Sequence, residues 1–239
     1  MASSRATGDT VLPGVAPASV KICGIRTVDH ALVAVAAGAE LIGMIFAPAR
    51  RQVSIQTARA ITDAVHAARP EVRLVGVFVD APTREVNQTA MAAGLDLVQL
   101  NGDETPADVA DIDVGVIKAI RPVPGEDAER LAERIGRFQA APVAPVAVLI
   151  DGYDPHAHGG TGVRADWDLV ADVADRIGQP VGLAGGLTPV NLGRAIATAR
   201  PLFVDTSSGV ERAGVKDAAL IRTFVETADG SFETAPDAG

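Results

Sequence analysis

The segment RLVGVFVDAPTREVNQTAMAAGLDLVQL, residues 73–100, contains the unit that decides the fold. Its apolar runs at 73–79 and 95–100 are rich in Val and Leu, and an amphipathic stretch at 83–93 separates them. Such runs are typical of strands buried on both faces, which occur in parallel sheets covered by helices. The segment therefore predicts a strand, a helix and a second strand parallel to the first.

The same alternation continues along the chain and predicts about eight strand–helix units. We expect strands at 19–23, 41–46, 73–79, 95–100, 114–120, 146–151, 181–184 and 202–206. We expect helices at about 27–37, 54–68, 83–93, 105–111, 126–137, 166–177, 189–199 and 216–227. Eight units favour closure into one α/β domain, a (β/α)8 or TIM barrel, although an open doubly wound sheet would also alternate in this way.

The two ends of the chain lack this periodicity. Residues 1–18 are rich in Ser, Ala, Gly and Pro, and the last dozen residues are small and acidic. Segments of this composition cannot bury enough apolar surface to become ordered. We therefore predict a barrel from 19 to 227 between disordered tails at 1–18 and 228–239.

The composition of the chain excludes several classes of partner and indicates a compartment. A net charge of -9 would repel DNA or RNA, and one Trp, one Tyr and six Phe offer few stacking platforms for bases. No apolar run approaches the roughly 18 residues of a transmembrane helix, so no membrane partner is expected. A single cysteine and the lack of a signal-peptide core favour the cytoplasm.

The usual nucleotide and metal motifs are also missing. No G-x-G-x-x-G follows the first expected strand, and no G-x-x-x-x-G-K-[ST] occurs in the chain. His156 and His158 bracket Ala157, but no Cys, Asp or Glu at a familiar ligand spacing joins them. We predict no metal site.

Lys21 and Cys23 are the first candidates for chemistry. In a (β/α)8 barrel the active site lies at the carboxyl ends of the strands, and alternation places these two side chains on one face of the first strand. A neighbouring ammonium favours thiolate over thiol, could bring the pKa of Cys23 toward neutrality, and so permits proton abstraction from carbon. The alternative is that Cys23 is a small buried apolar residue.

Asp151 is the second candidate, because it follows the apolar run VAVLI directly. Partial desolvation at the rim of the core would raise the pKa of Asp151, and a protonated carboxyl group can act as a general acid. The alternative is an Asp that caps a turn.

Two glycine-containing loops follow the seventh and eighth expected strands, where barrel enzymes often bind phosphate. They are LAGGLTPVNL at 183–192 and VDTSSGVE at 204–211, and their purely structural alternative is a pair of tight turns. HGGTG at 158–162 is either a ligand-covering loop or an exposed connector. Arg50 and Arg51 are either an anion clamp or a solvated pair.

Taken in order, these segments resemble the phosphoribosylanthranilate isomerase family of tryptophan biosynthesis. The matching segments are VKICGI, FAPARRQVS, VGVFVD, VQLNGDE, KAIRP, GGTG with DW, LAGGLTPVNL and VDTSSGVE. The resemblance implies a cofactor-independent barrel that converts N-(5-phosphoribosyl)anthranilate into 1-(2-carboxyphenylamino)-1-deoxyribulose 5-phosphate by an Amadori rearrangement. It implies that Asp151 is the general acid that opens the sugar and that Cys23 is the base that takes the C2' proton.

The resemblance also implies the residues that bind a small phosphosugar substrate. Those expected at the sugar and anthranilate are Lys21, Arg51, Gln99, Asn101, Gly162 and Asp205, and those expected at the phosphate are Gly185, Gly186, Ser207, Ser208 and Gly209. Asn101 stands where the family usually carries a histidine, so any titratable role there is lost while hydrogen bonding is retained. We expect a monomer or a homodimer.

The sequence leaves two other hypotheses about function open. One is another phosphosugar isomerase or epimerase barrel, against which Cys23 and the lack of a metal-ligand set argue. The other is a non-catalytic phospholigand-binding paralogue that kept the phosphate loops.

Overall fold

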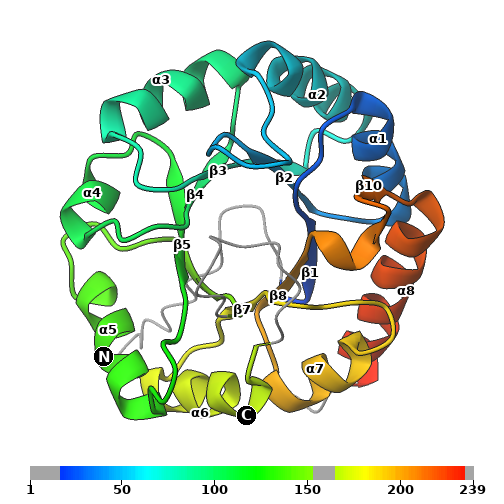
Figure 1. Cartoon of the computed structure of the whole chain (residues 1–239). Coiled ribbons are helices and arrows are strands. Elements are labelled where there is room, and N and C mark those ends of the chain that lie inside the picture. The colour runs from blue at the N-terminus through cyan, green and yellow to red at the C-terminus, as the bar shows by residue number, and fades with distance from the viewer. Residues whose placement is uncertain (1–16, 153–164, 235–239) are drawn as a thin grey trace, which may run out of the picture.

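The chain forms a closed barrel of eight parallel strands surrounded by a ring of helices (Figure 1). The computed structural model describes residues 17–152 and 165–234. The strands are β1 Ser19–Ile22, β2 Leu41–Ile45, β3 Arg73–Phe78, β4 Leu97–Leu100, β5 Gly115–Ile120, β6 Ala147–Ile150, β7 Gly182–Leu183 and β8 Phe203–Thr206. The barrel closes where β8 pairs with β1, with Val20 opposite Val204 and Ile22 opposite Thr206. The predicted barrel is confirmed, and the open sheet is excluded.

Helices lie between the strands at the expected places. They are α1 Val28–Ala37, α2 Ile55–Ala68, α3 Thr83–Ala93, α4 Pro106–Ala110, α5 Ala128–Gln139, α6 Trp167–Ile177, α7 Leu192–Ala199 and α8 Ala218–Thr234. The side chains of Thr27, Ser54 and Asp127 accept hydrogen bonds from the first turns of α1, α2 and α5, as N-cap residues do. Within the described ranges, none of the helices combines the length and apolar character that a membrane span requires.

Side-chain alternation along the strands creates two separate cores. Outward residues such as Val20, Ile22 and Val98 pack against the helices. Inward residues fill the barrel with a smaller cluster that includes Leu41, Val75, Leu97, Ile117, Ala119, Leu149 and Phe203. On β1, β4 and β8 the inward positions nearer the carboxyl end are polar, namely Lys21, Gln99 and Asp205, so this parity decides which polar side chains meet inside the barrel.

The structure differs from the expectation in the segment between β8 and α8. A short 3-10 helix, η1 Ser208–Val210, leads into an antiparallel hairpin of β9 Glu211–Arg212 and β10 Val215–Lys216. Helix α8 was expected from 216, but it begins at Ala218. Strands of two residues show no periodicity that a sequence pattern could reveal.

The C-terminal boundary also differs from the expected one. Residues 228–234 belong to α8 instead of a disordered tail, because Ala228 is fully buried and Phe232 packs against the outer core. Ala228 and Phe232 continue the helical spacing of Ile221, Phe224 and Val225. The small polar residues between Ala228 and Phe232 make this helical spacing hard to recognise in the sequence.

We predict that Gly182→Ala destabilises the barrel, because an added Cβ would lie 2.4 Å from the ring of Phe203. Overpacking of this kind costs about 1–3 kcal/mol in the free energy of unfolding, which urea denaturation measures. The double variant Gly182→Ala, Phe203→Leu should recover part of that loss.

Gly136→Ala in α5 is the matched control, because its Cβ meets nothing within 4 Å. The same change should stabilise the helix by roughly 0.5–1 kcal/mol. A Gly182→Ala protein as stable as the wild type would contradict the tight fit.

Candidate active site

Polar side chains gather inside the barrel at the carboxyl ends of the strands. The inward positions of β1, β4, β6 and β8 and their first following residues hold Lys21, Cys23, Gln99, Asn101, Asp151 and Asp205, all of them buried. The even spacing of these positions along each strand directs them to the interior, above the apolar layer. The predicted site residues of four separate strands therefore converge.

Lys21 and Asp205 form a buried ion pair at the seam that closes the barrel. The two residues stand opposite each other in the β1–β8 register, and Lys21 Nζ lies 3.1 Å from Asp205 Oδ2. Burial disfavours the ammonium, but Asp205 and the neighbouring Cys23 outweigh it and raise the pKa of Lys21. Lys21 is therefore charged at neutral pH. Asp205 Oδ1 is buried and has no hydrogen-bond partner among the described residues.

Cys23 lies beside Lys21, in a space that a glycine provides. A Cβ on Gly43 of β2 would lie 2.8 Å from Cys23 Sγ and 3.1 Å from Lys21 Nζ, so any larger residue would displace these two side chains. Burial raises the pKa of the Cys23 thiol; Lys21 lowers it, Asp205 raises it, and Lys216 lowers it. The expectation that Lys21 brings this pKa toward neutrality is wrong for the free protein, because burial and Asp205 outweigh the cations. In the free protein, burial therefore favours the thiol form of Cys23.

Asp151 follows β6, and its backbone N–H donates to the Ile120 carbonyl at 3.1 Å. Burial, followed by the negative charge of Asp205, raises the pKa of Asp151 to about 6, while Arg121 and the Gly152 N–H act in the opposite direction. The expected rise in the pKa of Asp151 is confirmed. Asp151 thus holds a proton at a far higher pH than an exposed aspartate does.

Gln99 and Asn101 form the wall of the site at the end of β4. Gln99 Nε2 donates to Asn101 Oδ1 at 2.9 Å, while Gln99 Oε1 is buried without a partner in the described part of the chain. Arg121, which the sequence did not single out for this site, donates from Nη2 to the Asn101 carbonyl at 2.9 Å. The amide of Asn101 is therefore held in a fixed orientation.

Lys118 does not face the site, although it belongs to the polar end of its strand. Its position on β5 points outward, and its Nζ binds Glu104 Oε2 at 2.8 Å and the Gly102 carbonyl at 2.8 Å. This buried ion pair fixes the loop that follows Asn101.

The loops after β7 and β8 lie against each other, as the phosphate-site prediction requires. A Cβ on Gly209 would lie 1.8 Å from the Leu187 carbonyl oxygen, and Thr206 Oγ1 donates to the same oxygen at 2.9 Å. Gly185 and Gly186 have φ angles of +99° and +61°, which favour glycine. Gly185, Gly186, Ser207, Ser208 and Gly209 are thus brought to one corner of the barrel mouth. Gly162 lies outside the described residues, as do His156, His158 and most of the β6–α6 connection.

Arg51 is buried and bound to a carboxylate that the sequence analysis did not identify. Its Nε and Nη2 donate to Glu211 Oε1 and Oε2 at 2.7 and 2.9 Å. Lys216 Nζ and Arg50 Nη2 also reach Glu211, each at 3.0 Å. Although burial acts against ionisation, Arg51 and Lys216 lower the pKa of Glu211 to about 2. The only advance signal for Glu211 was its place at the end of SSGVE, since the contacts join residues about 160 positions apart.

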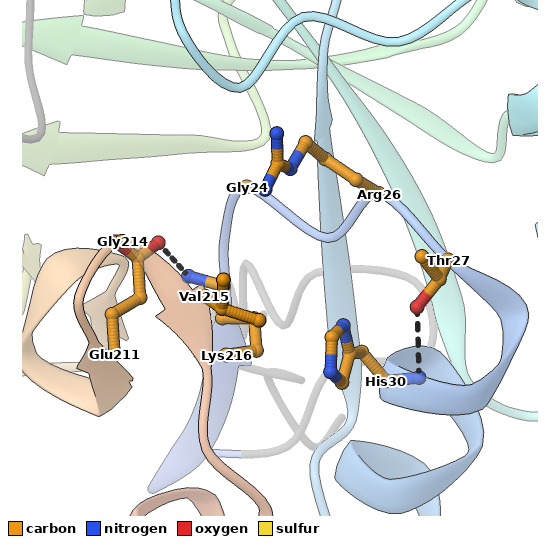
Figure 2. A pocket seen from close by; sticks show the side chains of 8 residues that line it. All are labelled: Gly24, Arg26, Thr27, His30, Glu211, Gly214, Val215 and Lys216. Atoms are coloured by element: carbon orange, nitrogen blue, oxygen red, sulfur yellow. Dashed lines mark hydrogen bonds and ion pairs between the residues drawn. The ribbon is translucent and has the colours of Figure 1, made fainter.

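A cavity of about 330 Å³ adjoins this cluster between the β1–α1 loop and the β9–β10 hairpin (Figure 2). It is lined by Gly24, Arg26, Thr27, His30, Glu211, Gly214, Val215 and Lys216. Figure 2 shows the Glu211–Lys216 ion pair on one side and the Thr27 cap of α1 on the other. Among the described residues, no three His, Cys, Asp or Glu side chains lie together as a metal site.

Known proteins with the same arrangement of segments place the chain in a family. The family model described as N-(5'phosphoribosyl)anthranilate (PRA) isomerase matches residues 20–227. An N-(5'-phosphoribosyl)anthranilate isomerase of Roseiflexus sp. is 47% identical over 215 residues, which cover 88% of this chain and 97% of the relative.

Two solved structures are similar over most of their length. Phosphoribosyl anthranilate isomerase from Thermotoga maritima has a TM-score of 0.76 and 34% identity, with 89% of this chain and 98% of that one covered. A phosphoribosyl anthranilate isomerase in complex with reduced 1-(o-carboxyphenylamino)-1-deoxyribulose 5-phosphate has a TM-score of 0.73 and 33% identity, with the same coverage. The chain belongs to the N-(5'phosphoribosyl)anthranilate (PRA) isomerase family.

Proposed function

We propose that this chain catalyses the Amadori rearrangement of N-(5-phosphoribosyl)anthranilate with Cys23 as the base and Asp151 as the acid. The observation that carries the assignment is that both residues are buried inside the barrel mouth. The ion pair between Lys21 and Asp205 also acts on the pKa of both residues. Lys21 lowers and Asp205 raises the pKa of each of them. An acid and a base that both lie in the buried polar layer at the mouth of one barrel can act on one small sugar.

In the proposed reaction Asp151 gives its proton to the ribose ring oxygen as the C1'–O bond breaks. The nitrogen lone pair forms the C1'=N bond of an iminium ion. Cys23, as thiolate, then removes the proton from C2', and the electrons of that C–H bond form the enolamine, which tautomerises to the ketone. No electrons enter or leave the substrate, so the reaction needs no redox partner.

The remaining predicted residues would position the substrate. Asp205 Oδ1 and Gln99 Oε1 are buried acceptors without described partners, and sugar hydroxyl groups would satisfy them. Asn101 offers a fixed amide in place of a titratable histidine. We assign the phosphate to the loops of Gly185, Gly186, Ser207, Ser208 and Gly209, and the anthranilate to the neighbourhood of Arg51. The family resemblance adds Gly162.

We propose a cytoplasmic enzyme that is a monomer or a homodimer. The support for the compartment is the biosynthetic family and the single cysteine. The support for the oligomeric states is that the Thermotoga maritima relative is a dimeric enzyme of which monomers have also been generated.

Cys23→Ser and Asp151→Asn should each lower kcat by about two to four orders of magnitude, because each removes one proton-transfer group from an enforced site. Turnover is followed as loss of anthranilate fluorescence on addition of phosphoribosylanthranilate. Asp172→Asn, an exposed change on α6, is the control and should retain kcat. Wild-type-like kcat in either site variant would reassign that role. Wild-type protein that binds the substrate without turnover would support the phospholigand-binding alternative.

Asp151→Asn should also be more stable than the wild type above pH 7. Asp151 has a folded-state pKa of about 6 against an ordinary 3.8, so the folded protein binds this proton more tightly than the unfolded chain does. The stability of the wild type therefore falls as the pH rises from about 4 to 6, by up to about 3 kcal/mol. Asparagine cannot ionise, so thermal unfolding should show a gain at pH 8 that disappears near pH 4. An equal gain at pH 8 and at pH 4 would refute the electrostatic cause.

A further inference from the structure

The β9–β10 hairpin buries a lysine beside the carboxyl end of β1. Lys216 stands opposite Glu211 in the hairpin register, and its side chain is 3% exposed. Its Nζ donates to the Ser207 carbonyl at 2.7 Å and to Glu211 Oε1 at 3.0 Å. Burying an ammonium is costly unless it is paired, so this geometry fixes the Lys216 charge at one place.

Lys216 lies next to the segment that carries Cys23, the candidate base. The Cys23 N–H donates to the Thr206 carbonyl at 2.8 Å, so Cys23 runs alongside the residues that precede η1. A Cβ on Gly24 would lie 2.8 Å from Ser207 Oγ, so this glycine lets the chain after Cys23 pass against Ser207. Lys216 donates to the Ser207 carbonyl, and Cys23 donates to the carbonyl of the preceding residue, Thr206. Figure 2 shows Gly24, Glu211 and Lys216 around the same cavity.

Four charged groups from four elements act on the thiol. Lys21 comes from β1 itself, Asp205 from β8, Lys216 from β10 and Arg51 from the loop after β2. Lys21 is already compensated at 3.1 Å by Asp205, whose negative charge opposes the thiolate. Lys216 is a further cation that lowers the pKa of Cys23 against burial.

Glu211 favours the charged form of Lys216 through the 3.0 Å ion pair. Burial lowers the pKa of Lys216 below its ordinary value, and Glu211 and then Cys23 oppose this shift without reversing it. The interaction is reciprocal, because whatever stabilises the ammonium beside a thiolate also stabilises the thiolate. Glu211 therefore holds both Arg51 and Lys216 in place while leaving the cluster with an excess of positive charge.

We propose that Lys216, held by Glu211, is a positioning residue that stabilises the thiolate of Cys23. Its catalytic meaning rests on the proposed role of Cys23 as the base. The effect on the thiol itself can be measured without any substrate, so the two ideas can fail separately.

The test is the rate of Cys23 alkylation by the neutral reagent iodoacetamide at pH 8. Cys23 is the only cysteine of the chain, so the rate reports this thiol alone. Only the thiolate reacts, and loss of one nearby charge raises a thiol pKa by about one unit, so Lys216→Met should react roughly tenfold more slowly. Lys216→Arg retains the charge and should react within about twofold of the wild-type rate.

Lys118→Met is the matched control, because it also removes a buried lysine from an ion pair but on the outer face of β5. Its alkylation rate should equal that of the wild type. Loosening or unfolding would expose Cys23 and increase the rate, so it cannot imitate the expected decrease. If Lys216→Met does not fold, Lys216→Gln gives the same comparison and retains a donor for the Ser207 carbonyl. A folded Lys216→Met or Lys216→Gln protein that reacts as fast as the wild type would overturn the proposal.

Discussion

The interaction on which the rest of the site depends is the ion pair between Lys21 and Asp205. It lies at the seam where β1 meets β8, so barrel closure itself sets the Nζ–Oδ2 distance of 3.1 Å. Burying both charges is costly, and their attraction offsets this cost only because the register holds them together. Once formed, the pair acts on both proposed catalytic groups. Asp205 favours the protonated forms of Cys23 and Asp151, and Lys21 favours the ionised forms.

A second charged cluster explains how an acidic protein can receive an anionic substrate. The chain carries a net charge of -9, which would repel a phosphate ester at long range. At the rim, however, Arg50, Arg51 and Lys216 surround the single carboxylate of Glu211. Local cations act most strongly over short distances, because solvent and salt screen the distant acidic surface. The excess of positive charge therefore lies beside Ser207, in one of the loops that we assign to the phosphate.

Strand parity made much of this site predictable, and long-range contacts made the rest unpredictable. Lys21, Cys23, Asp151 and Asp205 follow from short apolar runs and a period of two, so the sequence alone directs them inward. Glu211 and Lys216 lie in a hairpin too short for any period, and their partners are distant in the chain. The sequence around Gly43 contains no pattern that predicts its position against Cys23. The pKa of Cys23 was misjudged because one neighbouring lysine was weighed without the burial that accompanies it.

The resting protonation states of Asp151 and Cys23 require one internal proton transfer before the proposed reaction. In the free protein Asp151 loses its proton at about pH 6, whereas Cys23 keeps its own to a higher pH, so the acid and the base begin in opposite forms from those the reaction needs. In the proposed reaction, protonation of the ring oxygen converts the substrate nitrogen into an iminium cation beside Cys23. That cation adds to Lys21 and Lys216 and stabilises the thiolate when it is required. Transfer of the Cys23 proton to Asp151 would supply both required forms without changing the number of protons in the site, after which Asp151 protonates the ring oxygen and the Cys23 thiolate accepts the C2' proton.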